Sequence, residues 1–336
     1  MTEGERTLGS SPTPANVSSD LDRLRRALGP TARFGEALAR HTSVRVGGPA
    51  DLFFAARTAE QLSAAVDRAA EAGIPWRVIG GASNLLISDE GIEGLVVKAA
   101  STGVEQIEAN GDVLVCAQAG AMLAALGKQM ALRGLRGLEW AVNVPGSVGA
   151  SVVNNSGAFG SCIAEHLVSA RIHIPGEGTV SFPISDLGHA YRTSRLKRGE
   201  INGVVLDATY RLTVEEEPEV LKERISEIQR IRRQTQPTGY SVGSVFTNPD
   251  GDSAGKLVES VGLKGFRIGD AEVSILHANF IVNRGAARAA DVLALMRHVQ
   301  DTVWQRAGVW LTAEVQLAGR FSVDDMLAPT PPGAAA

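Results

Sequence analysis

The sequence predicts an α+β protein that is built from more than one packed unit. Candidate strands and helices are mixed along the chain without the regular strand–helix–strand repeat that predicts a parallel α/β sheet. The length of 336 residues, with 44% hydrophobic and 21% charged residues, is enough for two or three hydrophobic cores. An acidic run that ends in proline, residues 214–218, marks a boundary. We therefore expect two N-terminal lobes followed by a third unit.

The first lobe is expected over residues 18–98. A helix is predicted from Asp20 to Leu28, with Ser19 as its N-cap. Thr58 and Gln61 have the spacing of a capping box, which predicts a second helix directly after them. Apolar runs predict strands from Asp51 to Ala56, from Trp76 to Ile79, from Gly94 to Val97 and, near the end of the chain, from Val309 to Leu317.

The second lobe is expected over residues 99–213 and the third unit over residues 214–308. Asn110-Gly111 lies between two apolar runs and predicts a hairpin with a type I′ turn, and residues 175–178 predict a second hairpin. The other expected elements are a helix over 121–132, a strand over 204–212, a charged helix over 218–233, a helix over 254–261, a strand over 279–282 and a helix over 287–306.

Composition excludes several classes of protein. The net charge is −4 and no block of basic residues occurs, so we expect no nucleic-acid partner. Every long apolar stretch is interrupted by Gly, Asn or charge, so we expect no membrane span, and the N-terminus lacks the apolar core of a signal peptide. A cytoplasmic location follows. Residues 1–17 and 323–336 are expected to be disordered tails, and Cys116 and Cys162 to be small buried side chains.

Three glycine-rich segments stand out among the 37 glycines: Arg45 to Ala50, Gly80 to Leu85, and Val144 to Gly160. Successive backbone amides in such turns can bind an anion such as a pyrophosphate. None of the segments contains G-x-G-x-x-G or the Gly-Lys-Ser/Thr of a phosphate loop, and each alone is more often a tight turn. Three of them within one stretch of the chain favour a ligand site.

The other familiar chemical signatures are missing from the sequence. The six histidines have no metal-ligand spacing, so no metal is expected, and there is no Gly-x-Ser-x-Gly nucleophile elbow. Hydride chemistry through a bound cofactor remains, because the cofactor then performs the difficult step. Polar segments at Tyr191-Arg192-Thr193-Ser194, at residues 241–249 and at Glu314 are candidates for the site, although each taken singly reads as an ordinary surface or loop feature.

Taken together and in order, these segments resemble the UDP-N-acetylenolpyruvoylglucosamine reductases, the MurB family, in its shorter subclass without an extra substrate loop. The similarity runs from about Leu38 to Gly319. It implies a two-lobed FAD-binding domain of the vanillyl-alcohol-oxidase and CO-dehydrogenase-flavoprotein type, completed by residues 309–322, and a smaller α+β substrate domain. The implied reaction is reduction of UDP-N-acetylenolpyruvoylglucosamine to UDP-N-acetylmuramate in peptidoglycan synthesis. NADPH would be the co-substrate, and we expect a monomer.

The resemblance also implies roles for individual residues. Arg192 and Glu314 would polarise the enolpyruvyl carboxylate, and Ser244 would donate a proton to C2. Bound FAD would be non-covalent, since the glycine-rich loops contain no histidine. The implied FAD contacts are Arg45, Gly80, Gly81, Ser83, Asn84, Leu85, Pro145, Gly146, Ser147, Val153, Gly157 and Ala158. The implied UDP-sugar contacts are Asn248, Lys256, Lys264 and Asn279.

The sequence departs from the family pattern at a few positions, and two other functions stay open. Leu311-Thr312-Ala313 precedes Glu314 where the family usually has Glu and Pro, and Thr247 stands where Lys is common, which puts one phosphate contact in doubt. An oxidase of the same fold would not need Ser244 as a proton donor. A non-catalytic sugar-nucleotide-binding protein would be expected to have lost at least one member of the catalytic set.

Overall fold

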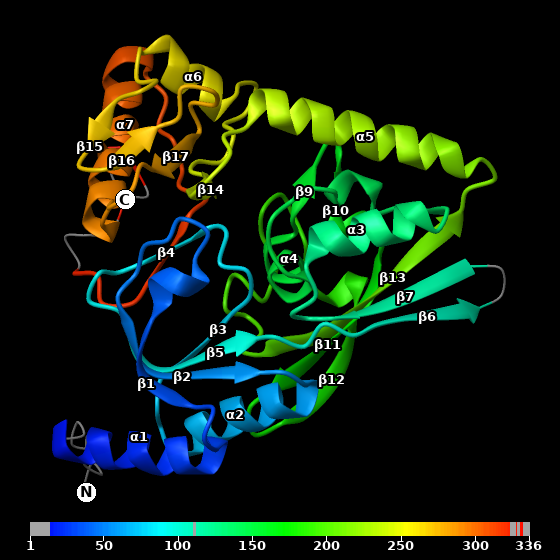
Figure 1. The fold of residues 1–336 in the computed structure, drawn as a ribbon, viewed down its shortest axis with the longest axis vertical. Coiled ribbons are helices and arrows are strands. Elements are labelled where there is room, and N and C mark those ends of the chain that lie inside the picture. Colours follow the sequence, from blue (N-terminus) through cyan, green and yellow to red (C-terminus); the bar gives the residue numbers. More distant parts are fainter. Residues whose placement is uncertain (1–13, 110–111, 323–326, 328–329, 332–336) are drawn as a thin grey trace, which may run out of the picture.

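The computed structural model describes residues 14–109, 112–322, 327 and 330–331. Three larger sheets are each packed with helices, and a long helix, α5 (Pro218–Thr235), runs from the second sheet to the third (Figure 1). This mixture of mainly antiparallel sheets and helices confirms the α+β prediction.

The first sheet has the strand order β1-β2-β5-β3 and packs on two helices. The predicted capping box is confirmed, because the Thr58 hydroxyl accepts from Gln61 N at 3.2 Å while Gln61 Oε1 accepts from Arg57 N at 2.8 Å. The elements are α1 (Pro14–Leu28), β1 (Arg33–Ala37), η1 (Leu38–His41), β2 (Pro49–Ala56), α2 (Ala59–Glu71), β3 (Trp76–Ile79), β4 (Leu85–Ile87) and β5 (Ile92–Ala99).

The second sheet has the order β12-β11-β13-β7-β6, and both predicted hairpins are present as antiparallel pairs. The expected type I′ turn at Asn110-Gly111 lies outside the described residues. The elements are β6 (Val104–Ala109), β7 (Asp112–Gln118), α3 (Leu123–Leu132), β8 (Leu135–Arg136), η2 (Glu139–Ala141), α4 (Val148–Asn154), β9 (Gly157–Ala158), β10 (Ser161–Cys162), η3 (Ile163–Glu165), β11 (Leu167–Ile174), β12 (Gly178–Pro183), η4 (Ile184–Asp186) and β13 (Val204–Val214).

The third sheet has the order β14-β17-β16-β15 and packs on α6 and α7. Helix α7 begins against the first lobe, because the Asp89 carboxylate accepts from the amides of Ala289 at 2.8 Å and Ala290 at 3.1 Å. The elements are β14 (Ser241–Ser244), α6 (Ala254–Ser260), β15 (Arg267–Ile268), β16 (Ala271–Val273), β17 (Phe280–Asn283) and α7 (Ala289–Ala307). The short β18 (Gln316–Ala318) pairs in parallel with β4 of the first lobe.

Two predicted elements have wrong bounds. Helix α1 begins at Pro14, so Ser19 lies inside the helix and part of the expected tail is helical. The predicted strand over 309–317 pairs only from Gln316, because residues 309–315 cross from the third unit to the first lobe. Leu311 and Val315 are buried in the core of the third unit. The sequence analysis interpreted these apolar residues as part of a strand.

Helix α5 was expected to belong to the third unit, yet its first half packs on the second lobe. Leu221 and Ile225 form a small core with Ala131 and Val142 of that lobe. The helix therefore packs on the second lobe and runs from there to the third unit (Figure 1). The remaining expected tail falls on residues 1–13 and on parts of 323–336 that the structure does not describe.

Candidate active site

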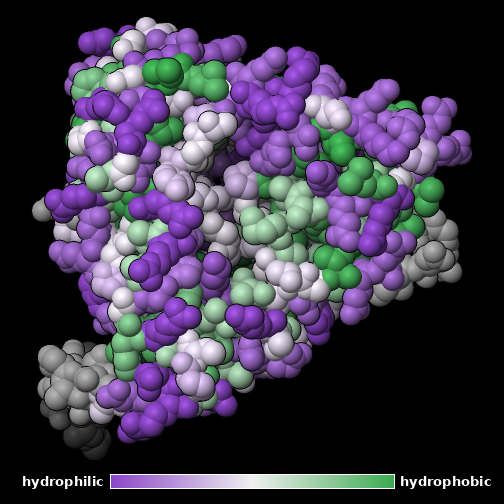
Figure 2. Space-filling model, in the orientation of Figure 1, coloured by the Kyte–Doolittle hydropathy of each residue, from purple (hydrophilic) through white to green (hydrophobic). Residues whose placement is uncertain are grey.

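A cavity of about 1350 Å³ lies where the two lobes and the third unit meet. Pockets for single drug-sized ligands occupy about 300–1000 Å³, so this cavity has room for a large ligand and a second one beside it. The surface is visibly hollowed between the third unit and the second lobe (Figure 2). The lining extends from the end of α2 and β3, past the glycine-rich loops, to Arg192, Ser244 and Glu314.

Two of the glycine-rich segments meet face to face at the cavity. A Cβ added to Gly80 would collide with the Ser147 hydroxyl, and one added to Gly81 would lie 3.1 Å from Gly146 Cα. Only residues without side chains allow this approach. The expected contacts Gly80, Ser83, Asn84, Leu85, Pro145, Gly146, Ser147, Val153, Gly157 and Ala158 all line the cavity.

Two expected FAD contacts do not line the cavity. Gly81 lies behind the lining, packed on Gly146. Arg45 donates from Nη1 to the Arg40 carbonyl at 3.1 Å and lies over the Tyr240 ring, 5.4 Å from its centroid. The Arg45 side chain is exposed, and its guanidinium contacts Arg40 and Tyr240 outside the cavity lining.

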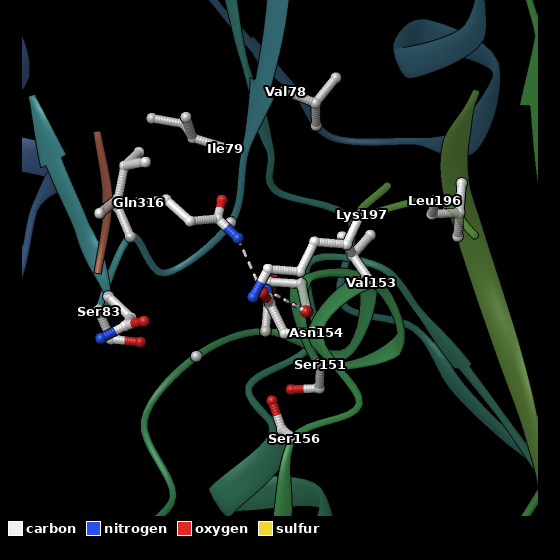
Figure 3. Close-up of a pocket in the computed structure, with 18 of the residues that line it drawn as sticks. Val78, Ile79, Ser83, Ser151, Val153, Asn154, Ser156, Leu196, Lys197 and Gln316 are labelled. Carbon is white, nitrogen blue, oxygen red and sulfur yellow. Dashed lines mark hydrogen bonds between the residues drawn. The ribbon is translucent and has the colours of Figure 1, made fainter. Parts of the chain in front are cut away.

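The lining suits a dinucleotide. The Ser147 hydroxyl is buried and has no hydrogen-bond partner among the described residues, although it sits between the two glycine-rich loops. A buried polar group without a partner is costly, so a ligand that accepts from it would stabilise this arrangement. The adjoining walls carry the apolar side chains of Val78, Ile79, Val153 and Leu196, which would cover a flat ring system (Figure 3).

A cluster of charges also lines the cavity. Arg192 Nε is 3.2 Å from Glu314 Oε1, and Lys197 Nζ donates to the Arg192 carbonyl at 2.8 Å. Arg192 has a φ of +56°, a left-handed conformation that costs energy for a residue with a side chain and is often found at functional sites. The tertiary fold thus holds a strained arginine beside a carboxylate.

Burial changes the protonation of this cluster. It raises the pKa of Glu314 above its ordinary value, while the Arg192 and Lys197 cations act in the opposite direction. Burial also lowers the pKa of Lys197, which Glu314 partly offsets. A carboxyl group with a raised pKa holds a proton more readily than an ordinary carboxyl group does.

Ser244 ends β14 and faces the same part of the cavity. The next residue, Val245, ties this segment to the Glu314 segment, because the Val245 carbonyl accepts from Glu314 N at 2.8 Å. Residues from the second lobe, the third unit and the crossing segment are therefore brought together at one place: Arg192, Ser244 and Glu314.

The four residues expected to bind the UDP-sugar do not line this cavity. Asn279 is buried, and its carboxamide exchanges hydrogen bonds with the Phe246 main chain at 2.9 and 2.8 Å. Asn248 accepts from Ala254 N at the start of α6, and Lys264 pairs with Glu259 at 2.7 Å. Lys256 is exposed on α6. The structure gives Asn279 a structural role, because both ends of its amide are occupied.

Polar side chains that we did not predict also line the cavity, among them Lys197, Arg232, Gln236 and Gln316. Gln316 donates to Asn154 Oδ1 at 2.8 Å and so joins β18 to α4 across the cavity wall (Figure 3). Arg232 and Gln236 come from the end of α5, which we had assigned to a solvated helix. Only Lys197 had a signal in the sequence, three residues after the polar Tyr191–Ser194 segment.

Some other expectations concern single groups. Both cysteines are free and partly exposed rather than buried, and burial with the nearby Asp207 carboxylate raises the pKa of Cys116.

Within the described part of the chain, no three His, Cys, Asp or Glu side chains gather as they would around a metal ion. None of the described helices is both long and apolar enough to cross a bilayer.

The fold and the cavity define the class of this protein. A model of the FAD-binding domain family matches residues 50–181, which contain the second and third glycine-rich segments and the buried Ser147 hydroxyl. The chain is thus an FAD-dependent oxidoreductase, with a second set of polar groups next to the cofactor loops.

A second family model, the C-terminal domain of UDP-N-acetylenolpyruvoylglucosamine reductase, matches residues 235–318. The chain is 41% identical to the UDP-N-acetylenolpyruvoylglucosamine reductase of Chloroflexus aggregans, over 85% of this chain and 97% of that protein. It is 45% identical to that of Synechococcus sp. strain RCC307, over 84% and 92%. The crystal structure of the reductase from Thermus caldophilus covers 85% of this chain and 98% of its own at 35% identity, with a TM-score of 0.71. The chain therefore belongs to the UDP-N-acetylenolpyruvoylglucosamine reductase family.

Proposed function

We propose that this protein reduces UDP-N-acetylenolpyruvoylglucosamine to UDP-N-acetylmuramate with NADPH, as a cytoplasmic monomer that serves peptidoglycan synthesis. The observation that carries the proposal is that Arg192, Ser244 and Glu314 line the same cavity as two of the glycine-rich segments. Bound FAD would supply the hydride chemistry, accepting a hydride from NADPH and passing it to C3 of the enolpyruvyl group.

Arg192 and Glu314 are suited to act on the substrate carboxylate. When a hydride reaches C3, negative charge develops at C2 and on the adjacent carboxylate. The planar Arg192 guanidinium can bind a carboxylate through two parallel hydrogen bonds and so stabilises charge where it forms. Glu314, with its raised pKa, can share a proton with the same carboxylate, whereas an ionised Glu314 would repel it.

Ser244 is suited to deliver the proton to C2. A serine hydroxyl is a weak acid, but a carbon that bears enolate character is basic enough to take its proton. Ser244 is partly exposed to the cavity at the point where the Glu314 segment crosses. This position supports the proposed role of Ser244 as the proton donor.

Arg232 and Gln236 are suited to bind the diphosphate of the UDP-sugar or of NADPH. Burial lowers the pKa of Arg232, and none of the described carboxylates lies within ion-pair distance of it. The buried Gln236 Oε1 also lacks a partner among the described residues. A partly buried cation in a cavity wall is stabilised by an anionic ligand. These two residues replace Asn279 in the proposed substrate site.

The test is a spectroscopic titration of the purified protein under anaerobic conditions. We expect a flavin band that bleaches with NADPH and returns when the enolpyruvyl UDP-sugar is added. If no flavin band appears even after FAD is supplied, the reductase proposal fails in favour of a sugar-nucleotide-binding protein. If air reoxidises the flavin but the sugar never does, the protein is an oxidase.

A further inference from the structure

Asn84 belongs to the second glycine-rich segment, Gly80 to Leu85, yet its side chain bonds to the third unit. Its Nδ2 donates to the carbonyl of Val242 at 3.0 Å and to that of Ser244 at 2.8 Å. These acceptors lie 158 and 160 residues further along the chain. An amide nitrogen carries two hydrogens, so both donors of Asn84 are used by the segment that ends in Ser244.

The residue between the two acceptors is held in an uncommon conformation. Gly243 has a φ of +75°, and a Cβ added to it would lie 3.0 Å from the Ser83 carbonyl oxygen and 3.4 Å from Asn84 Nδ2. The turn at Gly243 is therefore pressed against the Ser83–Asn84 loop, with one Asn84 hydrogen bond on each side of it. Together these contacts fix the direction in which the Ser244 side chain leaves the backbone.

The main chain of Asn84 is fixed as well. Its carbonyl accepts from Gln316 N at 3.1 Å, at the end of the segment that carries Glu314. The segment of Ser244 is bonded to the same crossing chain through Val245 and Glu314. Asn84 is thus the residue of the first lobe to which both catalytic segments are attached.

We propose that Asn84 is a positioning residue, which orients Ser244 for proton transfer by holding the Val242 and Ser244 carbonyls. This inference rests on the proposed function, because it assigns Ser244 the role of proton donor. It also revises the expected role of Asn84 as an FAD contact, since Nδ2 has no hydrogen left to donate to the cofactor. Asn84 thereby sets the position of the Ser244 hydroxyl, the proposed proton donor, relative to the Gly80–Leu85 loop.

The variant Asn84→Ala tests this by separating the two halves of the reaction. We expect oxidation of the reduced flavin by the enolpyruvyl UDP-sugar to slow by about 10²-fold, the effect of moving a reacting group by about 1 Å. Bleaching by NADPH and the FAD content should stay within about twofold of wild type, because Ser244 has no part in that half. Asn84→Asp, which keeps the size but replaces the donors by acceptors, should be slowed at least as much.

A double-mutant cycle with Ser244→Ala shows whether Asn84 acts through the serine. Ser244→Ala alone should slow the oxidative half by about 10² to 10⁴-fold, the usual contribution of a general acid. In the double variant this rate should be less than about threefold below that of Ser244→Ala, because the proton donor is already absent. Multiplication of the two single effects would overturn the proposal.

The matched control is Asn283→Ala. Asn283 also donates from Nδ2 across a unit boundary, to the Val44 carbonyl at 2.9 Å, and does not line the cavity. We expect it to lower the melting temperature without changing the ratio of the two half-reaction rates. Amide hydrogen exchange offers a readout without turnover: residues 242–246 should exchange faster in Asn84→Ala, with or without FAD, and at the wild-type rate in Asn283→Ala.

The outcomes for the inference and for the proposed function are distinct. If wild type is never reoxidised by the sugar, the proposed function fails. If wild type turns over but Asn84→Ala slows both halves equally, or loses only FAD, then Asn84 serves the cofactor site and the inference is wrong.

Discussion

Ser147 shows how much a single side chain can decide at this site. Its hydroxyl is buried without a partner between two loops that only glycine allows to approach. The apoprotein therefore bears the cost of an unsatisfied polar group, which a bound cofactor would relieve. At this scale the sequence predicted that glycine, serine and asparagine line the cavity wall, because these residues in turns can bring backbone amides and side-chain donors to a ligand.

Ser147→Ala should weaken FAD binding without lowering the free energy of unfolding of the apoprotein. Loss of one hydrogen bond to a charged group costs about 1.5–3 kcal/mol, which raises the Kd for FAD about 10- to 100-fold. The free energy of unfolding of the apoprotein should stay the same or rise by up to about 1 kcal/mol. Flavin fluorescence titration and urea unfolding measure the two effects.

Ser101→Ala is the matched control for this prediction. The Ser101 hydroxyl is likewise buried and without a partner among the described residues, but it does not line the cavity. It should give the same small change in the stability of the apoprotein and no change in FAD affinity. Equal affinity of Ser147→Ala and wild type for FAD would show that the hydroxyl does not face the cofactor.

The sequence did not determine which groups the side chains of single residues point toward. Asn84 and Asn279 were both expected to bind ligands, but both use their amide groups on main-chain atoms of the Ser244 segment. An asparagine can donate and accept equally well toward a ligand or toward the backbone. Only the placement of neighbouring units decides between the two.

At the scale of elements, helix α7 shows how one unit is attached to another. Its first two amides, Ala289 N and Ala290 N, donate to the Asp89 carboxylate of the first lobe. A carboxylate at a helix N-terminus satisfies free amides and interacts favourably with the helix dipole. The helix was predictable from its apolar pattern, but its cap was not, because the cap lies 200 residues earlier in the chain.

Asp89→Ala should lower the free energy of unfolding by about 1–2 kcal/mol, the usual cost of losing an N-terminal cap. Asp291→Ala is the control, because Asp291 accepts from Arg288 N at 2.9 Å within the same helix terminus. A larger loss for Asp89→Ala in urea denaturation would measure the contribution across the boundary between units. A change below about 0.3 kcal/mol would show that solvent replaces Asp89 at this terminus.

At the scale of the whole molecule, three half-buried histidines make the stability depend on pH. Burial lowers the pKa of His166, His189 and His277 below the ordinary value of 6.5. The unfolded chain therefore binds protons more readily than the folded protein just below pH 6.5. The stability that these neutral histidines contribute is present above pH 6.5 and is lost as the pH falls below it.

We therefore expect the melting temperature to decline from pH 7 to pH 5.5, before the paired carboxylates titrate. The pKa values of Glu36 and Glu272 are lowered by their hydrogen-bonded partners His41 and Arg284, so their contribution is lost only below about 4.5. His189→Gln can keep a donor to the Val152 carbonyl, which His189 Nε2 contacts at 2.7 Å. Its decline over this range should be shallower; an identical profile would exclude His189 as a contributor.

The sequence by itself determined the class of fold, most of the helices and strands, and the three residues that we propose to be catalytic. Apolar periodicity, capping patterns and hairpin turns act over a few residues, so they can be recognised without the fold. The resemblance to a family added roles that no local pattern carries, and the ordered segments from Leu38 to Gly319 were enough to identify it.

Only the tertiary structure decided which side chains share the cavity. It placed Arg232 and Gln236 of α5 in the cavity wall, removed Asn279 from it, and attached Ser244 to Asn84. It also shortened the closing strand to Gln316–Ala318, because the residues before it cross between two units. These outcomes depend on contacts between separate segments, 33 residues apart for Asn279 with Phe246 and 160 residues apart for Asn84 with Ser244. Such contacts leave no periodic signal in the chain.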